Sequence, residues 1–212
     1  ISIAQCKDAL DKAAAAPGNG LLETGIFEPH AAAATALAFT NAPTRYVMVF
    51  DMGAGTVDIA AFEFDERTDP PALSEVKEAR QCSALAGDEI DRILVELYLR
   101  KRGGEKNRED EVRLLKTAVL NARELKRELF TTGKCSLKTG WMATTIRANE
   151  LMEDQNFRTY LGALRQTIAA SLQRVVARAE ANGGDVIDVV LAGGGSRLPF
   201  MVDLVKSAAT LK

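Results

Sequence analysis

The sequence has few of the residues that mark a metal site, a disulfide framework or a membrane span. Its 212 residues include one histidine, His30, and three cysteines at positions 6, 82 and 135. No two of these cysteines have the spacing of metal ligands, and we expect all three to be reduced thiols of a cytoplasmic protein. The apolar runs fall short of the ~20 residues that a bilayer span needs, and no basic stretch followed by an apolar one opens the sequence. We therefore expect no membrane partner.

Net charge is also small, because 27 basic residues nearly balance 29 acidic ones and leave −2. A near-neutral chain has no general electrostatic reason to bind nucleic acid. Hydrophobic residues make up 47% and charged residues 26%, as in ordinary globular proteins, and the length suits one large domain or two small lobes. The chain begins at Ile1 within helix-like sequence, so we expect it to be a piece of a longer protein.

Helix and strand patterns alternate along the chain. Helices are predicted over Ser2–Ala16, Gly87–Arg102, Glu111–Phe130 and Phe157–Ala181, in "RANELMEDQN", and from Pro29 and Pro199 onward. Strands are predicted over Leu21–Phe27, Tyr46–Phe50, Val57–Phe64, Leu73–Ser83, Cys135–Thr139, Trp141–Arg147 and Val186–Leu191. This order predicts the α/β class, with a mixed sheet and a smaller inserted lobe.

An acid and a glycine turn separate two apolar strands in "YVMVFDMGAGTVDIAAFEF", residues 46–64. Glycine turns let backbone N–H groups approach phosphate oxygens closely. The residues after this turn favour a strand, which excludes a dinucleotide-binding turn, and the absence of "GK[ST]" excludes a P-loop. Two interpretations remain: a hairpin whose tip contacts phosphate, or a plain hairpin, because "DMGAGT" has ordinary turn composition.

The polar residues around this turn favour a magnesium–phosphate site. Asp51 would lie beside the tip, where a carboxylate suits Mg²⁺, an ion that keeps several waters and bridges phosphates. Thr56 offers a hydroxyl to the terminal phosphate, and Asp58 can hold a metal-bound water. A second turn, "LAGGGSRLP" at 191–199, places Ser196 near a helix cap and is compatible with a phosphate or nucleoside. Its alternative is a tight connection that needs glycine only for packing.

Four stretches together resemble the heat shock 70 chaperone family of the actin-like ATPase superfamily. They are "EPHAAAA" (28–34), "VFDMGAGTVDIA", "LAGDEID" (85–91) and "VVLAGGGSRLP", while "ARELKRELF" (122–130) is similar to the family's adenine-side helix. The resemblance implies an actin-like, ribonuclease H-like α/β lobe with a mixed sheet and a smaller inserted α+β lobe. Residues 1–40 would end a first lobe, 41–102 and 155–212 would form the second large lobe, and 103–154 the inserted lobe.

The resemblance also implies roles for individual residues. Glu28 would position the attacking water, and Asp51 and Thr56 would complete the catalytic set. Asp51 and Asp58 would hold Mg²⁺ through water, and monovalent K⁺ would lie near Asp88 and Glu89. ATP or ADP would be bound by Gly53, Ala54, Gly55, Lys126, Arg127, Gly193, Gly194 and Arg197.

Three positions depart from the family pattern. Ala54 replaces the middle glycine of the turn, which is tolerable if its φ stays negative. Arg123 falls where the family often has an acid that contacts the ribose, and Phe130 falls where it has a small hydroxyl residue. These departures keep open a degenerate, non-hydrolysing relative that acts by protein contacts. A filament-forming actin-like ATPase is another alternative, because such proteins share the "EP" and glycine motifs.

The main prediction is part of the ATP-binding domain of a heat shock 70-like chaperone, in which nucleotide controls peptide binding. For the full protein, the resemblance implies unfolded client peptides, a J-domain co-chaperone and a nucleotide exchange factor as partners. Nothing in this sequence resembles the family's first phosphate hairpin and its lysine. Because phosphoryl transfer needs charge neutralisation from both sides, we expect negligible ATP hydrolysis by this chain alone.

Overall fold

The structure is a computed structural model that describes residues 28–39, 46–65, 72–102, 108–139, 142–183 and 186–210. The predicted helix at 2–16 and the predicted strand at 21–27 lie outside these ranges. The chain divides into two compact units. The first unit comprises residues 1–51, 58–82 and 170–192, and the second comprises 52–57, 83–169 and 193–212. The lobe boundaries inferred from the sequence stay a prediction.

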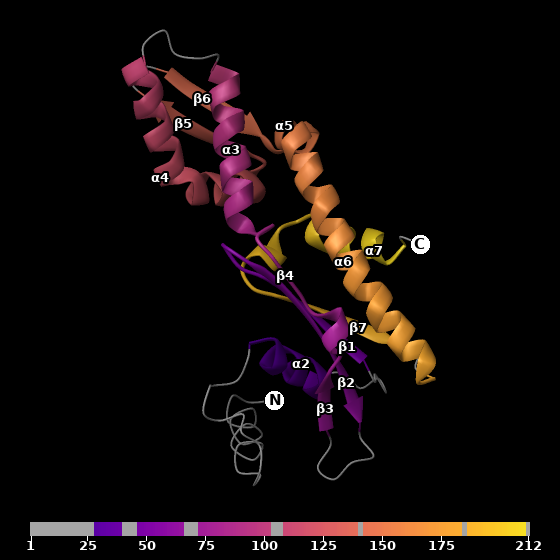
Figure 1. Ribbon diagram of the computed structural model, residues 1–212. Helices are drawn as coiled ribbons and strands as arrows, with labels where there is room; N and C mark the ends of the chain where they lie inside the picture. Colours follow the sequence, from indigo (N-terminus) through magenta and orange to yellow (C-terminus); the bar gives the residue numbers. More distant parts are fainter. Residues whose placement is uncertain are drawn as a thin grey trace. The chain divides into compact units, whose positions relative to one another are not determined.

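The first unit is built on a five-stranded sheet (Figure 1). Its strands are β1 (Tyr46–Met52), β2 (Val57–Asp65), β3 (Ala72–Glu75), β4 (Gln81–Ser83) and β7 (Ile187–Ala192). The order is β3-β2-β1-β7, and β4 also pairs with β2. Strands β1 and β7 are parallel, whereas β2 and β3 are antiparallel. The predicted mixed sheet is therefore confirmed.

Helix α2 (Glu28–Phe39) covers one face of this sheet (Figure 1). Ala33 of the helix packs against Val47 and Val49 of β1 and against Ala60 and Phe62 of β2, all of them buried. Alanine allows this close approach, which explains the alanine-rich sequence of the helix. Because residues in a strand alternate between faces, the residues between these positions, Met48 of β1 and Ala61 of β2, point to the opposite face.

The residues after α6 (Gln155–Ala181) and the end of that helix bind the opposite face of the sheet within the first unit. Asn182 donates a hydrogen bond of 3.0 Å to the hydroxyl oxygen of Tyr46. Arg178 pairs with Glu63 of β2 at 3.5 Å. Strands β1 and β2 are therefore covered on both faces, which explains why their sequences are almost continuously apolar.

The second unit consists mainly of helices around a two-stranded sheet. Its elements are α3 (Gly87–Arg102), α4 (Arg108–Thr132), β5 (Lys134–Thr139), β6 (Met142–Arg147), α5 (Ala148–Glu153), the first part of α6, the short 3₁₀ helix η2 (Gly195–Arg197) and α7 (Met201–Ala209). Helix α4 packs on both α3 and β5. The buried hydroxyl of Tyr98 on α3 donates a hydrogen bond of 3.3 Å to the sulfur of Cys135 on β5. Within the described ranges, every helix is too short or too polar to span a bilayer.

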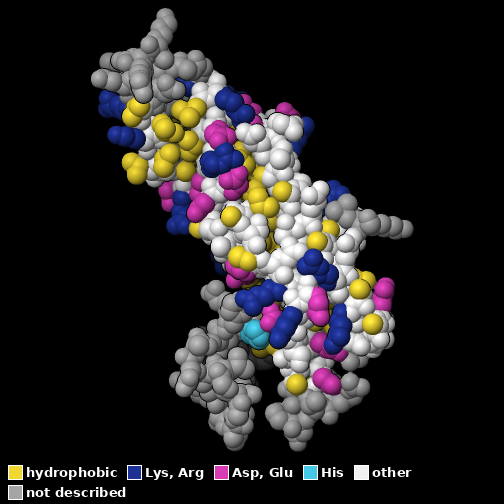
Figure 2. All heavy atoms as spheres, in the orientation of Figure 1, with side chains coloured by type: hydrophobic (Ala, Val, Ile, Leu, Met, Phe, Trp, Pro, Cys, Tyr) yellow, Lys and Arg dark blue, Asp and Glu magenta, His cyan; other side chains and the backbone are white. Residues whose placement is uncertain are grey.

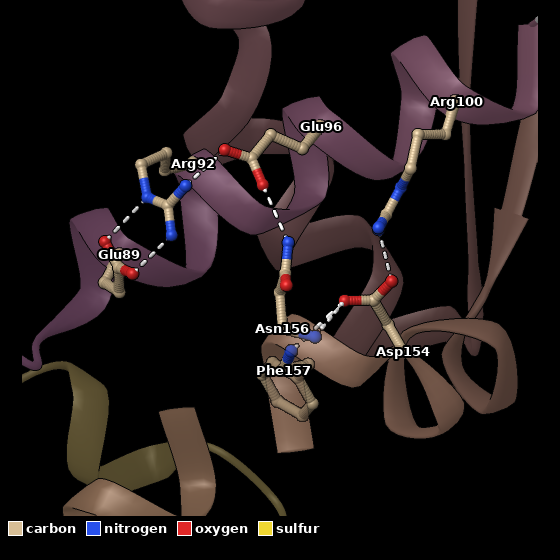
Figure 3. A network of polar contacts seen from close by, with 7 residues as sticks. All are labelled: Glu89, Arg92, Glu96, Arg100, Asp154, Asn156 and Phe157. Carbon is tan, nitrogen blue, oxygen red and sulfur yellow. Dashed lines mark hydrogen bonds and ion pairs between the residues drawn. The ribbon is translucent and has the colours of Figure 1, made fainter. Parts of the chain in front are cut away.

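A polar network joins α3 to the start of α6 (Figure 3). Arg92 donates two hydrogen bonds to Glu89, of 2.9 and 2.6 Å, and also bonds to Glu96. Asn156 donates to the other oxygen of Glu96 at 3.0 Å. These contacts lie at the surface, where each contributes little alone, but together they fix how the two helices align within the second unit.

Asp154 caps the N-terminus of α6 (Figure 3). Its Oδ1 accepts the backbone N–H groups of Asn156 at 2.9 Å and Phe157 at 3.1 Å. These are among the donors that the first turn of a helix leaves without an intrahelical partner. Arg100 of α3 pairs with the other carboxylate oxygen. The cap therefore sets both the start of α6 and its contact with α3.

Helix α4 exposes apolar side chains on one side of the second unit. Val112, Leu115, Val119 and Leu120 are respectively 43, 41, 57 and 85% exposed. Figure 2 shows hydrophobic side chains gathered over this helix, with basic and acidic side chains at their border. By contrast, Leu129 on the same helix is fully buried.

The predicted single strand over residues 73–83 is wrong. The segment forms β3 and β4, separated by the 3₁₀ helix η1 (Lys77–Ala79). Both strands pair with β2, so the break interrupts an edge and not the sheet core. Val76 has a non-strand backbone conformation, and the N–H of Ala79 bonds to its carbonyl at 2.9 Å. The run "KEAR" contains good helix formers, which was the available signal.

The last helix begins at Met201, two residues after the predicted start at Pro199. Leu198 is extended, with φ −63° and ψ 136°, as expected for a residue that precedes proline. Ser196 does not cap this helix. Its hydroxyl donates to the carbonyl of Gly193 at 2.7 Å and so closes the glycine turn on itself.

Candidate functional site

The turn between β1 and β2 exposes its backbone amides. Gly53 donates its N–H to the carbonyl of Thr56 at 2.9 Å. The carbonyls of Gly53 and Ala54 accept the first N–H groups of α3, from Gly87 at 3.2 Å and Asp88 at 2.7 Å. Within the described part of the chain, no hydrogen bond uses the N–H groups of residues 54–56. Such unused amides in a tight turn form an anion-binding surface.

Ala54 is compatible with this turn. Among the described residues, positive φ angles occur only at Gly133, Gly183 and Gly193. Ala54 therefore avoids the left-handed conformation in which a β-carbon is strained. Its methyl group requires no distortion of the backbone, so the departure from three consecutive glycines leaves the shape of the turn intact.

Asp51 and Asp58 lie on one face of the sheet in the first unit. Asp51 lies two and four residues after Val49 and Val47, and Asp58 lies two and four residues before Ala60 and Phe62. Residues at this spacing share one face of a strand, so both acids belong to the face that α2 covers. Both are half-buried, on neighbouring strands, at the end where the turn joins them. No group of three or more His, Cys, Asp or Glu in the described ranges could hold a metal ion. Two carboxylates that act through water fit the preference of Mg²⁺ for few protein ligands.

Cys82 is a neighbour that the sequence did not reveal. It lies on β4, and a hydrogen bond between its thiol and the carboxylate of Asp58 raises the pKa of the thiol. Cys82 is exposed and forms no disulfide. The sequence gives no local sign of this contact, because 24 residues separate Cys82 from Asp58 along the chain. The pairing of β4 with β2 brings the two residues together.

The second unit contains a pocket of about 620 Å³, within the usual range for small-molecule sites. It brings together most of the predicted nucleotide-binding residues. It is lined by Gly53, Ala54, Gly87, Arg123, Lys126, Arg127, Phe130, Thr131, Gly194, Gly195, Arg197, Leu198 and Pro199. Gly55, Thr56 and Gly193, which were also predicted, are exposed residues of the two turns but do not line it.

Two glycines shape the wall of the pocket that residues 193–199 form. Gly193 has φ 76°, a conformation that favours glycine. At Gly195, a β-carbon would lie 2.5 Å from Cγ of Met52, closer than real contacts allow. Gly195 therefore has a packing role, whereas a β-carbon at Gly194 would meet no atom within 4 Å. This role does not exclude ligand binding, because Gly195 also lines the pocket.

Lys126 is held in place and is not a free cation. Its ammonium donates to the carbonyl of Gly87 at 2.7 Å and to Asp91 at 2.9 Å. Burial raises the pKa of Asp91, while the hydrogen bond and charge of Lys126 act in the opposite direction. A β-carbon at Gly87 would come within 3.2 Å of Lys126 Nζ and of the carbonyl of Gly53. Gly87 and Asp91 therefore build the site, although the sequence indicates them only as members of the "LAGDEID" motif.

The other predicted residues are placed as follows. Arg127 is largely exposed and pairs with Glu124 one turn earlier on α4. Glu28 is the first residue of α2, but its side chain lies outside the described set. Of the two acids predicted near K⁺, Asp88 is exposed. Hydrogen bonding to Arg92 lowers the pKa of Glu89. The roles assigned to these residues stay predictions.

Fold and site together define a class: an α/β protein whose mixed sheet carries a phosphate-compatible turn, with a basic pocket in the second unit. The Hsp70 protein family matches residues 9–212. The chain belongs to the Hsp70 family, and the predicted actin-like α/β fold is confirmed with it. The match also favours the main functional prediction, an Hsp70-like chaperone ATPase domain, over a filament-forming relative.

Curated relatives agree with this family. The chain is 27% identical to the chaperone protein HscA of Cronobacter sakazakii over 187 residues, which cover 88% of this chain and 28% of the relative. It is 27% identical to the chaperone protein dnaK3 of Synechocystis sp. over 195 residues, covering 89% and 24% respectively. It is 30% identical to an HscA homolog of Acidovorax sp. over 177 residues, covering 83% and 26%. The chain thus spans about a quarter of the length of these relatives.

Proposed function

We propose that this chain forms part of the ATP-binding domain of an Hsp70-type chaperone, in which nucleotide binding controls the affinity for unfolded protein segments. The observation that carries the proposal is the turn at residues 53–56. Its carbonyls are held by α3, and its N–H groups at 54–56 have no partner among the described residues. Family membership supports the choice of nucleotide over other phosphate compounds.

In this proposal the chain binds and orients the nucleotide. The amides of the turn hold phosphate oxygens, and Thr56 adds its hydroxyl. Asp51 and Asp58 hold Mg²⁺ through water, and the ion supplies charge neutralisation for the phosphates. The nucleoside end occupies the pocket between α4 and residues 193–199, where Gly194, Lys126 and Arg127 contact it. Glu28 positions the attacking water, and K⁺ is a further candidate ligand beside Asp88 and Glu89.

Binding is tested by isothermal titration of ATP into the chain with and without Mg²⁺. We expect Mg²⁺ to increase the affinity of the chain for ATP. The double variant Asp51→Asn, Asp58→Asn should bind ATP with Mg²⁺ about 10–100-fold more weakly than the unchanged chain, the loss typical of residues that orient metal ligands. Asp203, an exposed residue of α7, provides the matched control, and Asp203→Asn should leave the gain unchanged. Absence of binding heat with ATP at any Mg²⁺ concentration would overturn the proposal.

A second candidate is a non-hydrolysing relative that acts by protein contacts. Phe130 and Arg123 favour it, because both line the pocket where the family has smaller or acidic residues. The same titration separates the two candidates, since an inert relative would release no heat. We also expect this chain alone to hydrolyse ATP negligibly. Turnover by the isolated chain at the rate of an intact Hsp70 protein would contradict this expectation.

The wider setting belongs to the proposal as well. Client peptides, a J-domain co-chaperone and a nucleotide exchange factor are the partners we propose for the full protein. A cytoplasmic location is supported by the described cysteines, Cys82 and Cys135, which are both free thiols. We also propose residues 41–102 and 155–212 as the large lobe, with 103–154 as its insertion.

A further inference from the structure

One face of α4 forms a basic wall of the pocket. Arg123, Lys126, Arg127 and Phe130 follow the spacing i, i+3, i+4, i+7 that places residues on one side of a helix, and all four line the pocket. Arg197 adds a further cation from the turn after β7. No aspartate or glutamate is among the lining residues. The pocket therefore presents positive charge at the end where we place the nucleoside.

Two of these cations are already neutralised by acids outside the lining. Lys126 bonds to Asp91 at 2.9 Å, and Arg127 pairs with Glu124. Arg123 and Arg197 are exposed, and neither makes a hydrogen bond or ion pair with any residue of the described ranges. Arg123 interacts with Asp91 only as a charge acting through space. The pocket thus keeps two guanidinium groups available for a ligand.

A nucleoside whose ribose carries no phosphate offers no anion to the guanidinium groups of Arg123 and Arg197. A purine can stack on one guanidinium, and Phe130 offers aromatic surface nearby, 5.7 Å from the ring of Phe200 between centroids. Ribose hydroxyls are neutral, and nucleotide sites usually bind them with an acid. Where an arginine takes that position in dinucleotide-binding folds, it accommodates a phosphate on the ribose. Arginine binds phosphate oxygens through two parallel hydrogen bonds.

We propose that this pocket prefers nucleotides that carry a phosphate on the ribose 2′- or 3′-oxygen in addition to the 5′-phosphate, and that Arg123 binds the ribose phosphate. The inference rests on the proposed function, because the 5′-phosphate is assumed to reach the turn at residues 53–56. It names the chemical class of ligand, an adenosine nucleotide with an anionic ribose, which family membership alone does not specify.

The preference is tested by isothermal titration of the chain with AMP, adenosine 2′,5′-bisphosphate and adenosine 3′,5′-bisphosphate at one ionic strength. ATP with Mg²⁺ is titrated in parallel. Each bisphosphate differs from AMP only by the ribose phosphate. We expect one bisphosphate to bind about tenfold or more tightly than AMP, the gain that one charge-assisted arginine–phosphate contact provides.

Variants then assign the gain to Arg123. Arg123→Glu should abolish the difference between the bisphosphate and AMP, and Arg123→Gln, a milder change, should reduce it. Arg113→Glu is the matched control, because Arg113 is exposed on the same helix and does not line the pocket. It changes net charge equally and should preserve the preference. Far-ultraviolet circular dichroism checks that each variant keeps its helices.

The outcomes separate the two hypotheses. If ATP binds but AMP and both bisphosphates bind with equal affinity, the inference is wrong and the proposed function stands. If Arg113→Glu weakens the bisphosphate as much as Arg123→Glu does, the effect is one of overall charge and the inference is also wrong. If neither ATP nor any other nucleotide binds, both fail.

Discussion

Replacing Gly195 with alanine tests how tightly the glycine turn at residues 193–195 packs on Met52, the last residue of β1. A β-carbon at this position would lie 2.5 Å from Cγ of Met52, 2.8 Å from its sulfur and 3.0 Å from its carbonyl oxygen. Met52 is the last residue of β1 and is fully buried. The methyl group therefore enters space that is already occupied, and the neighbouring atoms must move.

The expected cost follows from which atoms can move. Methionine is flexible, and its sulfur can rotate away. The Cγ atom can move only by rotation about the Cα–Cβ bond of a fully buried side chain, and the carbonyl oxygen can move only if β1 or the turn shifts. Overpacking of this kind costs about 1–3 kcal/mol of the free energy of unfolding.

Urea unfolding followed by circular dichroism measures this cost, and Gly162→Ala provides the control. Gly162 lies in α6, and a β-carbon there meets no atom within 4 Å. The control should gain about 0.5–1 kcal/mol, because alanine favours a helix over glycine. If Gly195→Ala unfolds at the same urea concentration as the unchanged chain, with the same slope, the steric argument is refuted.

Three further predictions concern other contacts. Asp154→Ala should lower the free energy of unfolding by about 0.5–2 kcal/mol through loss of the α6 cap, measured by thermal unfolding, whereas Asp154→Asn should retain most of it. Hydrogen bonds from Lys101 and from the Arg147 backbone lower the pKa of Glu150, so its contribution is present above the usual value near 4.5 and is lost as pH falls through the folded-state pKa. Glu150→Gln should therefore make stability less sensitive to acid in urea titrations at several pH values, and an unchanged acid sensitivity would contradict this. On α4, Leu129→Ala should cost about 2–5 kcal/mol and Leu120→Ala less than about 0.5 kcal/mol, because the first is buried and the second is 85% exposed. Equal urea midpoints for these two variants would show that the orientation of α4 is wrong.

The sequence predicted most elements because their signals are local. The helix at 87–102 has the predicted bounds, since a glycine and two acids open it and an apolar stripe runs along it. The strand predicted over 73–83 is interrupted because its two halves pair separately with β2, and the helix formers of "KEAR" between them were the one local signal of the break. Boundaries set by tertiary pairing cannot be read from propensity alone.

The site residues also divide into those with a local signal in the sequence and those that only tertiary contacts bring together. The two glycine turns were found because their composition is unusual at strand ends. The contact between Lys126 and Asp91 could not be predicted, because the two residues lie 35 positions apart. The spacing of Asp91 on α3 also fits an ordinary solvent-facing acid. Cys82 was interpreted as a free thiol, and nothing in its neighbours along the chain indicates the bond to Asp58.

The motif "LAGDEID" acquires a physical role from these contacts. The first N–H groups of α3 are occupied by the carbonyls of Gly53 and Ala54, so they are not available to a ligand. An anion at the turn of residues 53–56 must then be bound by the turn's own amides. The N-terminus of α3, which contacts this turn, adds its positive partial charge. A β-carbon at Gly87 would lie 3.2 Å from both the carbonyl oxygen of Gly53 and Nζ of Lys126, a tight fit to which the flexible lysine can adjust more readily than the backbone carbonyl. The glycine turn, the start of α3 and the basic face of α4 therefore constrain one another, which explains why motifs so far apart in sequence occur together.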